Sequence, residues 1–184
     1  MKTANLTKNF KLQYASNLFV TSHEKPLFPL FLQPSAPNLA LVGNVGNPRS
    51  PFFSSFFDWA SSRWDSIIYV PGPEEQSETY NPCEILKFHQ NVFVLNKQNP
   101  FYIHEPLKLA LWTPTESSLY SKLYVFTYDQ EHNRTFLEHH GTIYSHGING
   151  INKKIHINSR GNQEHPEIGF DTQATMNFPV KKYH

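Results

Sequence analysis

The sequence predicts an α/β domain with a mixed β-sheet, and its two halves contribute different observations to this prediction. In the first half, apolar stretches at 38–48 and 67–72 enclose an amphipathic stretch at 50–66. This order is typical of a strand, a crossover helix and a parallel strand. In the second half, short apolar stretches follow one another closely between residues 91 and 112, as in a series of hairpins. We expect a core spanning roughly 11–171.

The first half has the clearest element boundaries. Residues 11–20 predict the first strand, and 21–37, with four prolines, predict an excursion loop. The continuously apolar stretch 39–42 predicts a strand that is covered on both faces. Ser50 can cap the helix at 50–66, and Pro51 suits its first turn. The apolar side chains of this helix recur at helical spacing and predict a buried stripe of Phe53, Phe56, Phe57, Ala60 and Trp64, with Trp59 off the stripe as a candidate interface residue.

The second half combines a short helix with further strands. We expect a helix at 81–91 with Cys83, Leu86 and His89 facing inward, strands at 91–96, 100–104 and 107–112, two short strands around the Gly-Ile-Asn-Gly turn within 141–161, and an irregular tail from Asn162. Within 113–140, the periodicity of SLYSKLYVFTYD fits a helix and a strand equally well.

Charge and composition exclude several classes of function. The net charge of +1 gives no electrostatic case for binding nucleic acid or an anionic membrane. Cys83 is the single cysteine, so an internal disulfide cannot form, which fits a reducing compartment or a fold that needs no disulfide. No stretch reaches the ~20 apolar residues of a membrane span, and the N-terminal residues lack the apolar region of a signal peptide. We therefore expect residues 1–184 to be a single domain in the cytoplasm or in a particle assembled inside the cell.

Several segments follow one another in a fixed order along the chain: LQYASNLF (12–19), LALVGNVGN (39–47), FFDWASSRWDSIIYVPGPEE (56–75), the hairpin and Leu-Trp-Thr strand of 91–115, IYSHGI (143–148) and KIHINSRGNQEHPEIGFD (154–171). In this order the chain resembles the calcineurin-like metallophosphoesterases in their compact bacterial-type form. The resemblance implies a metallophosphoesterase-like two-sheet β-sandwich flanked by helices, contracted in the middle. It also implies that strands 12–17, 39–43 and 67–71 are neighbours with their C-terminal ends together.

Most of the family's metal ligands are replaced at the matching positions. The chain has Asn17 for an Asp, Phe19 for a His, Asn44 for the bridging Asp, Pro73 for an Asn, Glu74 for a His and Ile148 for a His, and it retains His146. A two-metal phosphoesterase holds its ions ~3.5–4 Å apart, and anionic ligands offset their mutual repulsion. A neutral amide at position 44 cannot do so. The resemblance therefore implies a pseudoenzyme with no catalytic residue and no bound metal.

Two functions follow from this pattern. The first is a catalytically inactive metallophosphoesterase-like protein that contacts protein partners as a structural or interaction subunit, in a larger assembly such as a virus particle. The second is a phosphoesterase with a rearranged site, in which Glu74, Glu75, His139, His140 and His146 hold manganese, zinc or iron.

The candidate ligand residues also have simpler, purely structural interpretations. Asn17 and Asn44 are expected to shape the loops at the strand ends. Glu74 and Glu75 are expected to be a solvated pair on a turn. The histidines at 139, 140, 146 and 156 are expected to cluster by chance, because their spacing matches no standard zinc site.

Overall fold

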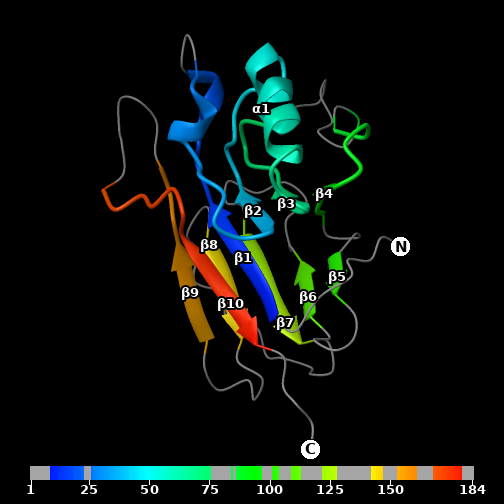
Figure 1. The fold of residues 1–184 in the computed structure, drawn as a ribbon, viewed down its shortest axis with the longest axis vertical. Helices are drawn as coiled ribbons and strands as arrows, with labels where there is room; N and C mark the ends of the chain where they lie inside the picture. Colours follow the sequence, from blue (N-terminus) through cyan, green and yellow to red (C-terminus); the bar gives the residue numbers. More distant parts are fainter. Residues whose placement is uncertain are drawn as a thin grey trace, which may run out of the picture.

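The computed structural model describes residues 9–22, 26–75, 84, 86–96, 101–103, 109–112, 122–127, 142–146, 153–160 and 168–179. Its elements, in chain order, are β1 (Asn9–Ala15), the 3-10 turns η1 (Val20–Ser22) and η2 (Phe28–Leu30), β2 (Asn38–Val42), α1 (Pro51–Ser61), β3 (Ser66–Val70), β4 (Val92–Val94), β5 (Phe101–Ile103), β6 (Leu109–Trp112), β7 (Lys122–Thr127), β8 (Thr142–His146), β9 (Lys153–Ile157) and β10 (Thr175–Pro179). Figure 1 shows their arrangement.

β1, β2, β3 and β4 are consecutive parallel neighbours in a five-stranded sheet with the order β10-β1-β2-β3-β4. β10 is antiparallel to β1 and lies at the edge of the sheet, as the red and blue ribbons in Figure 1 show. α1 connects β2 with β3. The expectation that the first three strands are neighbours with their C-terminal ends together is therefore confirmed.

A second five-stranded sheet has the order β5-β6-β7-β8-β9. Its pairs are antiparallel except for β7 and β8, which are parallel. The sequence pattern of SLYSKLYVFTYD fits a helix and a strand equally well, and in the structure residues 122–127 form a strand, β7. An α/β fold with a mixed, mostly parallel sheet and a helix is confirmed. That the whole is the metallophosphoesterase-like sandwich flanked by helices stays a prediction.

α1 forms where the sequence predicts a helix. The Ser50 hydroxyl accepts a hydrogen bond from the Phe52 backbone N–H over 3.3 Å, and Pro51 occupies the first helical position. The helix is shorter than expected and ends at Ser61, where the side-chain amide of Asn91 donates to the carbonyl oxygens of Ser61 and Trp64. α1, with 11 residues, is the longest helix described, and none in the described ranges has the length and apolarity that crossing a membrane requires.

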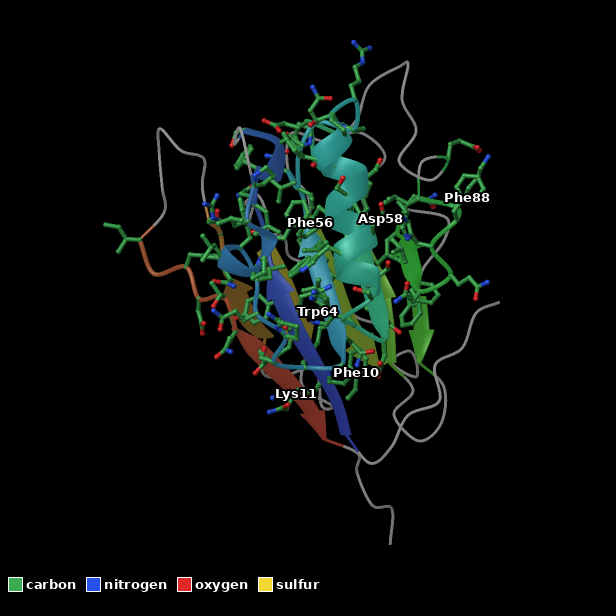
Figure 2. All side chains as sticks on the ribbon, turned by 45° about the horizontal axis from the view of Figure 1, so that its top comes forward. Phe10, Lys11, Phe56, Asp58, Trp64 and Phe88 are labelled. Carbon is green, nitrogen blue, oxygen red and sulfur yellow. The ribbon has the colours of Figure 1, made fainter. Side chains whose placement is uncertain are left out.

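The first sheet is buried on both faces, and its residues alternate between two apolar clusters. On one face, Leu39, Leu41, Ile67 and Tyr69 pack with the α1 stripe of Phe53, Phe56, Phe57 and Ala60 and with Trp64; the side chains of Phe56 and Trp64 can be followed beside α1 in Figure 2. On the other face, Leu12, Ala40, Val42, Ile68 and Val70 pack with Phe101 and Leu123 of the second sheet. All five residues of β2 and of β3 are buried, which confirms the expected strand covered on both faces.

Three expectations about the elements need correction. β1 ends at Ala15 and not at residue 20, because Asn17 and Phe19 have positive φ angles that a strand cannot accommodate. The helix expected at 81–91 does not continue through 86–90, which form turns; Leu86 is nevertheless buried as expected, and Cys83 lies outside the described residues. The tail is not irregular throughout, because 175–179 form β10, whose Met176 is buried in the apolar cluster that contains Leu12 and Leu123.

Candidate functional site

The C-terminal ends of β1, β2 and β3 lead into three loops that lie against each other. We call residues 16–20, 43–47 and 71–75 the strand-end loops. The Asn17 N–H donates to the Gly43 carbonyl over 3.0 Å, and the Gly43 N–H donates to the Val70 carbonyl over 2.8 Å. Because parallel strands bring their carboxyl ends to one edge, this is where an α/β sheet usually presents ligand-binding groups.

Two of the strand-end loops contain non-glycine residues in the left-handed region. The φ angles are +50° at Asn17, +48° at Phe19 and +42° at Asn44. Asparagine adopts this conformation readily, whereas phenylalanine rarely does. Phe19 is held by backbone hydrogen bonds on either side, from its own N–H to the Asn44 carbonyl over 3.1 Å and from the Val20 N–H to the Val45 carbonyl over 2.8 Å. The backbone of the neighbouring loop therefore supports the conformation of Phe19.

The side-chain amides of Asn17 and Asn44 form a chain of hydrogen bonds across the loops. Asn44 Nδ2 donates to Asn17 Oδ1 over 3.2 Å, and Asn17 Nδ2 donates to Ser159 Oγ over 2.9 Å. Asn44 Oδ1 accepts from the Glu74 backbone N–H over 3.3 Å. These contacts agree with the expectation that both asparagines shape the strand-end loops.

Glu75 is the acidic residue at the centre of the strand-end loops, and its side chain is 0% exposed. Its Oε1 accepts from the Gly46 N–H over 2.8 Å, and its Oε2 accepts from the Asn44 N–H over 3.1 Å and from the Gly72 N–H. The expectation of a solvated glutamate pair is thus right for the exposed Glu74 and wrong for Glu75. A buried carboxylate needs donors, and the backbone of two loops supplies them.

Burial changes the acidity of this carboxyl group. Desolvation raises the pKa of Glu75 to about 7, while backbone hydrogen bonds from Gly46, Gly72 and Val45 oppose the rise and the nearby Glu74 charge adds to it. Partial burial also raises the pKa of Glu74. The two neighbouring carboxyl groups therefore occupy different environments, one inside the loops and one at their surface.

Gly72 is required by the close approach of the loops. A Cβ at this position would lie 2.6 Å from Asn44 Oδ1, 2.9 Å from Glu75 Oε2 and even closer to the Asn44 backbone nitrogen. Any larger residue would push the β2 and β3 loops apart. Pro73, which follows it, is partly exposed.

The structure brings Asn17, Phe19, Asn44, Pro73 and Glu74 to one edge of the first sheet, as the sequence predicts. Of the remaining candidates, the backbone of His146 lies at the end of β8 opposite Lys153, and its side chain is not described. His139, His140 and Ile148 lie outside the described residues.

Two contributors to this site were not predicted. One is the buried position of Glu75, and the other is Ser159, which joins the site through an isolated bridge with Ser16. The similarity of 154–171 to the family's tail segment is the one signal that could have pointed to Ser159.

The strand-end loops do not fit a pair of metal ions. Both oxygens of Glu75 accept hydrogen bonds from backbone N–H groups, and an N–H group of Asn44 fills the space beside Asn17 Oδ1. Across the described part of the chain, no three His, Cys, Asp or Glu side chains are grouped so that they could hold a metal ion. The two-metal mechanism of the phosphoesterases therefore has no support in these residues.

Comparisons of the chain with protein-family models, with curated proteins and with solved structures found no match. The metallophosphoesterase family is accordingly a proposal for this chain, and it rests on the order of the motifs along the sequence.

Proposed function

We propose that the chain is a catalytically inactive metallophosphoesterase-like protein that acts as a structural or interaction subunit, within a larger assembly such as a virus particle. The observation that carries the proposal is the hydrogen bond between Asn44 Nδ2 and Asn17 Oδ1. In the family that the chain resembles, both positions are carboxylates that face metal ions. Here a donor N–H faces an acceptor oxygen, and the two side chains satisfy each other.

The charges of the strand-end loops support the proposal that the protein is catalytically inactive. Two divalent ions ~3.5–4 Å apart need anionic ligands between them. Asn17 and Asn44 are neutral, and Phe19 has no lone pair to offer. Glu75 carries the only carboxylate buried among the described strand-end residues, and backbone donors occupy it. A catalytic hydroxide would have no ion to generate it.

The surface supports a role in protein contact. Two leucines are exposed at η2, Leu27 at 64% directly before the turn and Leu30 at 66% at its end. Phe28 packs beneath them against Phe56 of α1, with ring centroids 5.5 Å apart. Neighbouring exposed apolar side chains on a rigid support are typical of protein interaction surfaces.

The alternative is a phosphoesterase with a rearranged site that uses Glu74, Glu75, His139, His140 and His146. Of these, Glu74 is exposed and therefore accessible to an ion. The hydrogen bonds of Glu75 are evidence against the alternative, because a metal ion could bind this side chain only by displacing its backbone N–H donors. Among the described residues, no observation favours a phosphoesterase over a structural or interaction subunit.

Elemental analysis of the purified protein tests the inactive half of the proposal. We expect well under one equivalent of manganese, zinc or iron per chain, before and after incubation with each metal and removal of the excess. Close to two tightly held ions per chain would overturn the proposal. About one ion per chain, lost in Glu74→Ala and His146→Ala variants, would support the rearranged phosphoesterase.

Site-specific photocrosslinking in the cell that makes the protein tests the interaction half. A photoreactive residue at position 30, on the surface that carries Leu27 and Leu30, is expected to yield a discrete crosslinked complex. The matched control is position 88, because Phe88 is also an exposed apolar residue, at 81%, but lies in the turn before β4. Crosslinks of equal yield from both positions, or none from position 30, would contradict contact at this surface.

A further inference from the structure

The N–H groups that surround Glu75 converge on its carboxyl group. The donors of Asn44 and Gly46 belong to the loop after β2, and the donor of Gly72 belongs to the loop after β3. Backbone N–H groups that converge in this way form concave sites, called nests, that bind phosphate, sulfate or carboxylate groups in other proteins. In this chain the carboxyl group of Glu75 occupies the nest.

The nest has a defined shape, because its backbone has little freedom. Asn44 has a positive φ angle, and Gly46 has a φ angle of +157° with no room for a Cβ, which would lie 2.7 Å from the Thr21 side chain. Gly72 is equally constrained by the Asn44 backbone. Removing the Glu75 side chain would therefore leave the donors pointing at a small, preformed space.

We propose that Glu75 is an internal latch, whose carboxyl group fills this nest and thereby closes the loops after β2 and β3, and that free acetate takes its place when the side chain is shortened. Glu75 lies 31 residues from Asn44 and 29 from Gly46, so the latch joins two separate strand ends. In a metal-dependent site, bound metal ions hold such loops together. Here the Glu75 side chain holds them together. The inference does not depend on the proposed function, because the latch would serve an enzyme with other ligands equally well.

The variant Glu75→Ala tests the latch, since it removes Cγ and the carboxylate group, which together have the size of one acetate ion. At least three N–H groups lose their acceptor, and we expect the thermal midpoint at pH 5, where the folded Glu75 is protonated, to fall by about 6–12 °C. At this pH both acetate and acetic acid are present, and sodium acetate should raise the midpoint of this variant by at least about 3 °C more than sodium chloride of equal ionic strength does. Pivalate, a carboxylate too bulky for the space, should not.

Glu74→Ala is the matched control, because it removes the same atoms from the neighbouring, exposed position. Acetate should affect Glu74→Ala and the unmodified protein equally and only slightly. An equal response of both variants to acetate, or a midpoint of Glu75→Ala within about 2 °C of the unmodified protein, would overturn the proposal.

If Glu75→Ala does not fold, amide hydrogen exchange in the unmodified protein tests the latch. The N–H groups of Asn44, Gly46 and Gly72 should exchange slowly and with similar protection, because one carboxylate holds them together. Exchange of any of the three at the rate of an unprotected loop amide would overturn the latch.

Discussion

The side-chain amide of Asn44 donates a hydrogen bond to the side-chain oxygen of Asn17 over 3.2 Å, and this contact joins the ends of β2 and β1. Asn17 is buried and donates onward to Ser159. An aspartate at either position could accept these bonds but could not donate them. The pair therefore suits a metal-free edge of the sheet, where the polar groups must satisfy one another.

The variant Asn44→Asp tests this pairing. A carboxylate oxygen would replace Nδ2, so two oxygens would face each other across the loops and the negative charge would lie near Glu75. We expect a loss of about 1–3 kcal/mol in the free energy of unfolding, measured by urea denaturation at pH 8. Asn44→Gly is the control, because glycine tolerates the positive φ angle and removes the hydrogen bond without adding charge. An Asn44→Asp variant at least as stable as the control would contradict the pairing.

Gly72→Ala should destabilise the protein by roughly 3 kcal/mol or more, because its Cβ would collide with the backbone of Asn44 and with Glu75. Gly169→Ala provides the comparison. Gly169 has a positive φ angle of +90°, but a Cβ there would meet nothing within 4 Å, so only the backbone strain of about 1 kcal/mol applies. Chemical denaturation of both variants measures the difference, and equal losses would show that the loops are not closely packed at Gly72.

The stability of the protein should depend on pH through Glu75. Its pKa rises from 4.5 in the unfolded chain to about 7 in the folded protein, so between these values the folded state binds the proton more tightly. The contribution of the protonated group is fully present below pH 4.5 and is lost as the pH rises through 7, a change of about 3 kcal/mol. The free energy of unfolding, measured relative to a Glu75→Gln variant, should therefore fall between pH 4.5 and 7. A difference that stays constant or grows with pH would contradict this assignment.

The positions of the main elements could be predicted because their signals are local. β2 and β3 are short apolar runs that end at or near glycine, and α1 has a capping serine, a proline in its first turn and an apolar stripe. The proximity of Asn17, Asn44 and Glu74 then follows from parallel pairing alone, because the carboxyl ends of neighbouring parallel strands meet at one edge.

The features that could not be predicted depend on partners far away in the sequence. Glu75 is buried because three N–H donors from two loops happen to converge on it, and nothing in PGPEEQ distinguishes it from the exposed Glu74. β10 forms because the edge of β1 offers unpaired backbone groups, with Lys11 opposite Asn177. A run as short as TMNFP is too weak a signal to indicate a strand without that partner.

Hydrolysis of a generic phosphodiester in the presence of manganese tests the central claim most directly. The unmodified protein is compared with a variant in which the family's ligands are restored: Asn17→Asp, Phe19→His, Asn44→Asp, Pro73→Asn, Glu74→His and Ile148→His. The account predicts no hydrolysis by the unmodified protein above the rate of manganese alone, at any manganese concentration tested, because Asn17 and Asn44 bind each other and backbone N–H groups occupy Glu75. Hydrolysis by the unmodified protein as fast as by the restored variant, and above that background rate, would contradict it.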